Sequence, residues 1–121
     1  MLPSSVAAFL NAGVAAVLRL PPDVAGNTCF VRIRPVAKPG VPREERRYLN
    51  STWSMWEYWD FEFRRVVLSS GWASDEWNYD RYIVHDERIS AFDPSSFAAA
   101  LSRWVADPTL LQRADDSDFP E

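Results

Sequence analysis

The sequence of 121 residues is poor in cysteine, histidine, glycine and lysine. Cys29 is its only cysteine, so no disulfide can form within the chain. His85 is its only histidine, and these two side chains are too few for the usual structural zinc site. Four glycines are present and none forms a Gly-x-Gly pattern, so the phosphate-binding loops of nucleotide-binding proteins are missing.

Few residue combinations in this sequence could support catalysis. Cys29 and His85 could in principle act as nucleophile and base, but a reactive thiol needs an electropositive, partly open environment, and Cys29 alternates with apolar residues. Asp60 and Glu62 lie two residues apart and would point the same way on a strand, as a glycosidase acid/base pair requires. Carboxylates with this spacing more commonly form a solvated face. We therefore expect a protein that is not an enzyme and that needs no metal or cofactor.

Length and composition indicate a single folded domain. Hydrophobic residues make up 47% of the chain, which is enough for a core of ordinary size. We expect residues 1–114 to form one domain and residues 115–121 to form an acidic, frayed tail. No Lys or Arg precedes the N-terminal apolar run, unlike in a secretory signal, and the run is shorter than the roughly 20 residues of a membrane span. The sequence thus predicts a cytoplasmic protein without a membrane partner.

The first half of the chain predicts a helix followed by a strand. Apolar residues at helical spacing predict a helix over residues 4–19, ended by the Pro-Pro pair that follows. Alternating apolar and polar residues predict a strand over 28–34, with Cys29 facing inward. Prolines over 35–45 indicate a loop or at most a surface hairpin, and we expect residues 46–51 to form a short strand.

The second half predicts a hairpin and a helix. Alternation favours a strand from residue 57 to 68, although a helix over 53–63 competes with it. A second strand over 77–84 would complete a hairpin around a loop at 69–76, and a tight turn at 85–87 and a short strand at 88–92 would follow. Asp93-Pro94 is a strong helix start, which predicts a helix to about residue 106, and Asp107-Pro108 predicts a short helix to 112.

These elements together indicate the α+β class. We expect a mostly antiparallel sheet of three to five strands, with an N-terminal and a C-terminal helix packed on it.

Charge is distributed unevenly along the chain. The formal net charge is −4, but residues 1–50 carry a net +4 and residues 51–121 a net −8. Five of the six tryptophans lie in the acidic part, between residues 53 and 77. The acidic balance argues against nucleic-acid binding through bulk charge. Exposed aromatic anchors ringed by carboxylates are typical of a surface that binds a basic protein.

The candidate partner-binding surface combines seven carboxylates with two tryptophans. We expect at least two tryptophans of the aromatic segment to be exposed, and charge reversal at Asp75 and Glu76 to weaken binding without unfolding the domain. The candidate residues are Asp60, Glu62, Trp72, Asp75, Glu76, Trp77, Asp80, Asp86 and Glu87.

In size, acidity and lack of a catalytic set, the chain resembles the immunity proteins of bacterial contact-dependent growth inhibition and related polymorphic toxin systems. The segments that carry the resemblance are WEYWDFEF at 56–63 and ISAFDPSSF at 89–97. The resemblance implies a protein that binds a cognate toxin domain, often a nuclease, and covers its basic active-site groove. The alternatives are a small carbohydrate-binding or glycosidase-like domain that uses segment 53–82, and a structural subunit of a larger assembly.

Overall fold

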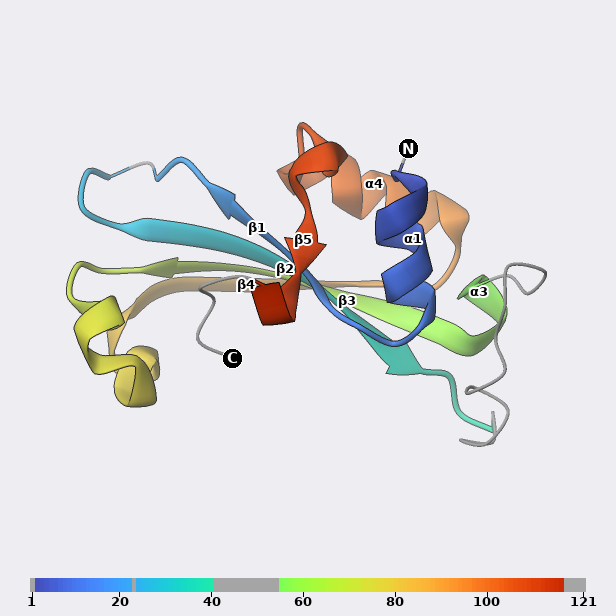
Figure 1. The fold of residues 1–121 in the computed structure, drawn as a ribbon, viewed down its shortest axis with the longest axis horizontal. Coiled ribbons are helices and arrows are strands. Elements are labelled where there is room, and N and C mark those ends of the chain that lie inside the picture. Colours follow the sequence, from blue (N-terminus) through green and yellow to red (C-terminus); the bar gives the residue numbers. More distant parts are fainter. Residues whose placement is uncertain (1, 23, 41–54, 117–121) are drawn as a thin grey trace.

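Five strands form one antiparallel sheet in the order β4-β3-β2-β1-β5 (Figure 1). The computed structural model describes residues 2–22, 24–40 and 55–116. The sheet confirms the α+β class and the antiparallel arrangement predicted from the sequence. The strands are β1 (Ala16–Leu20), β2 (Thr28–Ala37), β3 (Trp59–Leu68), β4 (Ile83–Ala91) and β5 (Gln112–Arg113).

Two helices cover one face of the sheet, and a 3-10 segment packs at one end of the opposite face. Figure 1 shows α1 and α4 together on one side, with η1 in yellow at the far end of the β3–β4 hairpin. The helical elements are α1 (Ser4–Asn11), α3 (Met55–Tyr58), η1 (Trp72–Tyr82), α4 (Pro94–Trp104), η2 (Pro108–Leu110) and η3 (Ala114–Asp116).

The larger apolar cluster lies between the sheet and the two helices. Alternate residues of the strands point into it, among them Ile33, Phe61 and Phe63, each at most 1% exposed. Phe97 of α4 meets both Phe61 and Phe63 edge to face, with ring centroids 5.1 Å apart in each pair. This face therefore holds most of the buried aromatic surface, which is the main source of stability in a domain of this size.

Helix α4 begins where the sequence predicts. The Asp93 side chain accepts a hydrogen bond from the Ser96 amide at 2.8 Å, and the Ser96 hydroxyl accepts one from the Asp93 amide at 3.2 Å. With Pro94 in the first turn, this is a complete capping box. The helix ends at Trp104, and its buried residues include Phe97 and Leu101.

The predicted helix over 4–19 is wrong beyond Asn11. Gly13 takes a φ of +86°, which only glycine adopts readily, and its amide donates to the Leu10 carbonyl. A Cβ at this position would also lie 3.1 Å from the Trp59 ring. Residues 16–18 are all buried because β1 is covered on both faces, and an unbroken apolar run of this kind looks the same in a strand and in a buried helix.

The predicted strand over 77–84 is also wrong in most of its length. Residues 72–82 form the 3-10 segment η1, kinked at Asp75 and Asn78, and strand β4 begins only at Ile83. The predicted turn at 85–87 lies inside β4. Residues 55–58 are helical and the strand begins at Trp59, so each of the two competing interpretations holds for part of this segment. The predicted strand over 46–51 lies outside the described residues.

Candidate functional site

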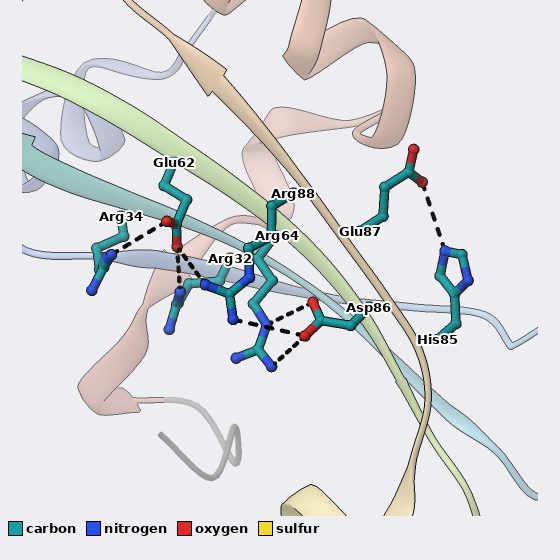
Figure 2. Close-up of polar contacts among 8 residues, drawn as sticks. All are labelled: Arg32, Arg34, Glu62, Arg64, His85, Asp86, Glu87 and Arg88. Atoms are coloured by element: carbon teal, nitrogen blue, oxygen red, sulfur yellow. Dashed lines mark hydrogen bonds and ion pairs between the residues drawn. The ribbon is translucent and has the colours of Figure 1, made fainter.

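The face of the sheet opposite the two helices carries a cluster of charged residues from three neighbouring strands. Strand register places Arg32 of β2 opposite Arg64 of β3, and Arg64 opposite Arg88 of β4. In the next row along the strands, Arg34 lies opposite Glu62. Alternate residues of a strand point to the same face, so all five of these side chains share it (Figure 2).

Glu62 lies among three arginines. One of its oxygens, Oε1, accepts a hydrogen bond from Arg32 at 2.9 Å and lies 3.9 Å from Arg88, and Oε2 accepts from Arg34 at 3.3 Å (Figure 2). The Arg32 side chain is 8% exposed, while those of Arg34 and Arg88 are 50% and 54% exposed. The carboxylate predicted to attract a basic partner is thus already surrounded by basic groups of its own chain.

Asp86 makes the best-formed ion pair of this face. Its two oxygens accept hydrogen bonds from Nε and Nη2 of Arg64, each at 3.0 Å, and Arg88 lies 3.7 Å away. The bidentate hydrogen bond with Arg64 lowers the pKa of Asp86 and raises the pKa of Arg64. The Arg64 side chain is only 4% exposed, whereas that of Asp86 is 30% exposed, so the pair is shielded from water on the arginine side alone.

The predicted acidic site is therefore divided between the two faces of the sheet. Asp60 and Glu62 do share a face, as their spacing predicts, but Asp60 pairs with Lys38 at 2.5 Å. Glu87 lies on the helix-covered side, where it accepts a hydrogen bond from Arg103 at 2.7 Å, and His85 is 3.7 Å away (Figure 2). The charge segregation of the sequence is reduced in space, because β2 pairs with β3 and this pairing brings Arg32 and Arg34 to Glu62.

The Cys29 and His85 pair considered from the sequence is not assembled. Cys29 lies opposite Val67 of β3, and Val67 lies opposite His85 of β4. Two strand spacings separate the pair by about 9–10 Å, beyond hydrogen-bond reach. Cys29 is also 1% exposed, whereas the His85 side chain is 49% exposed. The geometry offers no nucleophile and base in contact.

The segment η1 separates the two predicted anchor tryptophans. Trp72 is 5% exposed, donates through Nε1 to the Thr28 hydroxyl at 3.0 Å and meets Phe30 edge to face, so it belongs to the core. Trp77 is 99% exposed. It is the one exposed tryptophan among those whose side chains the structure describes; Trp53 lies outside the described residues.

The carboxylates of η1 have different surroundings. Asp75 accepts hydrogen bonds from the Asn78 amide at 2.9 Å and from the Tyr82 hydroxyl at 3.2 Å, and the latter bond raises the pKa of Tyr82. Asp75 therefore holds the bend of the segment. Asp80 is exposed, and the side chain of Glu76 lies outside the described part. Of the predicted site, Trp77 and Asp80 remain as exposed residues of η1.

An apolar pocket of about 530 Å³ lies between the helical elements on the covered side. It is lined mainly by apolar side chains, including Leu2, Trp56, Phe97 and Leu101. Its size is that of a small-molecule site. The lining residues within the described part of the chain are apolar apart from Ser102.

The sequence did not predict that arginines gather on the face of the sheet opposite α1 and α4, which we call the polar face. The shared face of Arg32 and Arg34 follows from their spacing, but the placement of Arg64 and Arg88 beside them depends on strand register. No sequence pattern encodes such a long-range register directly.

Residues 2–22, 24–40 and 55–116 contain neither a cluster of potential metal ligands nor a membrane-spanning helix. No group of three or more His, Cys, Asp or Glu residues in these ranges could hold a metal ion. No helix there is long and apolar enough to span a bilayer. Comparison with family models, curated proteins and solved structures found no match to the chain.

Proposed function

We propose that this chain is an immunity protein, which binds a cognate toxin domain and neutralises it by covering a basic active-site surface. The observation that carries the proposal is Trp77. Its side chain is 99% exposed at the end of the sheet, in an acidic segment that also presents Asp80. Water-exposed tryptophan is costly to a free protein, whereas tryptophan is the residue most enriched among interface anchors.

The proposed contact surface centres on η1 rather than on all nine residues suggested by the sequence. Asp60, Glu62 and Asp86 are paired with Lys and Arg side chains of the same chain. Carboxylates that are already paired contribute little attraction to a basic partner, whereas Asp80 on η1 contributes its full charge. Residues Trp77 and Asp80 would therefore supply the anchor and the steering charge.

The proposal is tested by co-expression with the toxin domain encoded next to this chain's reading frame. The wild-type chain should rescue growth and be recovered with the toxin domain in a pull-down. Trp77→Ala should weaken the complex by at least about tenfold in Kd, because a hot-spot tryptophan contributes about 2 kcal/mol or more. Leu110→Ala is the matched control, since Leu110 is also exposed, at 63%, but lies on η2.

Charge at η1 is tested separately with Asp80→Lys. This variant should slow association and make it less sensitive to salt, while the dissociation rate changes little. Asp80 is preferred to Asp75, because reversing the charge of Asp75 would break its bonds to Asn78 and Tyr82. Undiminished rescue and binding by Trp77→Ala, or no binding of the neighbouring toxin domain by the wild type, would refute the proposal.

A further inference from the structure

Three arginines lie directly opposite one another across three strands of the sheet. Arg32 is in register with Arg64, and Arg64 with Arg88. Like charges in facing positions destabilise a sheet, because their side chains are only about 5 Å apart at Cβ. Arg34 lies in the neighbouring row. We call these four residues, Arg32, Arg34, Arg64 and Arg88, the arginine face. Glu62 and Asp86 offset part of this repulsion, but a row of like charges is not what folding alone would favour, and it points to a use outside folding.

The arginine face has more positive than negative charge. Two carboxylates, Glu62 and Asp86, lie among its four guanidinium groups. Burial lowers the pKa of Arg32, and the charges of Arg34 and Arg64 lower it further, so the positive groups still repel one another in the presence of Glu62. An additional anion on this surface would relieve that repulsion.

The exposed members of the arginine face are placed to contact a ligand. The side chains of Arg34 and Arg88 are 50% and 54% exposed (Figure 2). Arg34 gives one hydrogen bond to Glu62, at 3.3 Å, and Arg88 lies 3.9 Å from Glu62, so these contacts use few of the five N–H donors that each guanidinium carries. Guanidinium groups hold carboxylates through two parallel hydrogen bonds. The more buried Arg32 and Arg64 add positive potential beneath them, where water screens charge less.

We propose that the arginine face binds an acidic segment of a partner protein, with partner carboxylates held by Arg34 and Arg88. Val36 shares this face and is 40% exposed, and Phe92, directly after β4, is 57% exposed. Arginine beside exposed apolar side chains is the composition of a protein interface. Nucleic acid is disfavoured, because a long polyanion would meet the chain's net charge of −4 beyond the arginine face, whereas a short acidic segment would meet this face alone. This surface is distinct from η1, and the proposal does not depend on the immunity function.

The test uses short synthetic peptides in which Glu alternates with Leu, titrated into the full chain and followed by fluorescence anisotropy. The double variant Arg34→Gln/Arg88→Gln should weaken binding by at least about tenfold, because two charge-assisted contacts are lost. Exposed Arg103 and Arg113 provide the matched control, Arg103→Gln/Arg113→Gln, which removes the same charge elsewhere and should bind like the wild type. Circular dichroism confirms that both variants fold.

Three outcomes would overturn this proposal. The first is an equal loss of binding in both double variants, or no saturable binding by the wild type. The second is tighter binding of a single-stranded oligonucleotide than of the peptide, which would assign the face to nucleic acid. The third is peptide binding only after residues 117–121 are removed, which would assign the face to the chain's own acidic tail.

Discussion

The two faces of the sheet are built from the same strands but serve different purposes. On the helix-covered face, alternate residues such as Phe61 and Phe63 are at most 1% exposed and pack against α4. On the opposite face, the intervening positions hold Arg32, Glu62 and Arg64 in ion pairs. Apolar burial contributes stability roughly in proportion to area, whereas ion pairs roughly offset their own desolvation. The helix-covered face thus holds the larger core. One end of the opposite face is also buried, where Trp72 of η1 packs on Phe30, and its charged part is the region available for binding.

The largest expected effect is on the covered face. Phe63→Ala removes a fully buried ring that meets Phe97, and should lower the free energy of unfolding by about 3–5 kcal/mol. Val36→Ala, at a partly exposed position of the polar face, should cost no more than about 0.5 kcal/mol. Urea denaturation of both variants measures the difference. Equal losses would contradict the division of roles between the faces.

A smaller effect is expected from breaking one ion pair of the polar face. Asp86→Asn leaves the Arg64 side chain, 4% exposed, without its facing carboxylate, and should cost about 1–3 kcal/mol at neutral pH. Asp80→Asn removes an exposed carboxylate and should cost at most about 0.5 kcal/mol. Chemical denaturation compares the two variants.

The same ion pair gives a pH dependence of known sign. The hydrogen bond with Arg64 lowers the pKa of Asp86 in the folded protein. The stability that the ionised Asp86 adds to the folded state is therefore fully present above about pH 4, the usual pKa of Asp. The contribution is lost as the pH falls through the lowered value. Asp86→Asn should therefore lose less stability on acidification than the wild type does. Parallel acid-unfolding curves for the two proteins would contradict this assignment.

The smallest of these effects is expected at the start of α4. Asp93→Ala removes the side-chain acceptor for the Ser96 amide and should cost about 1 kcal/mol. Asp93→Asn keeps an acceptor oxygen and should retain most of that stability. Thermal unfolding separates the two variants. An equal loss in both would show that the charge of Asp93, rather than its cap bond, stabilises the helix.

Local signals in the sequence predicted some elements correctly and others wrongly. Asp93-Pro94 located the start of α4, because a capping box needs only residues close together in the chain. Alternation located β2 and the buried Cys29, although the strand continues to Ala37. The apolar run at 16–18 was misinterpreted because β1 is buried on both faces and so has no alternation to detect.

The positions of the charged side chains depend on which distant strands pair, and the sequence did not predict this pairing. The net −8 of residues 51–121 suggested one acidic surface in that part of the chain. Pairing of β2 with β3 brings Arg32 and Arg34 onto Glu62 instead. Which residues face each other across strands depends on register, and register depends on the whole sheet. The sequence pattern predicted that Trp72 and Trp77 are both anchors for a partner, but only Trp77 is exposed and Trp72 is buried.

We propose that the charged face of the sheet serves binding and adds little to stability. The most direct test replaces its charged residues together in one variant. This variant combines five substitutions: Arg32→Met, Glu62→Gln, Arg64→Met, Asp86→Asn and Arg88→Gln. Well-packed neutral side chains in place of a buried ion-pair network are often neutral or stabilising by about 1–4 kcal/mol. We expect the free energy of unfolding in urea to be equal to or above that of the wild type. A loss of more than about 2 kcal/mol would show that the network stabilises the fold, and would contradict the claim.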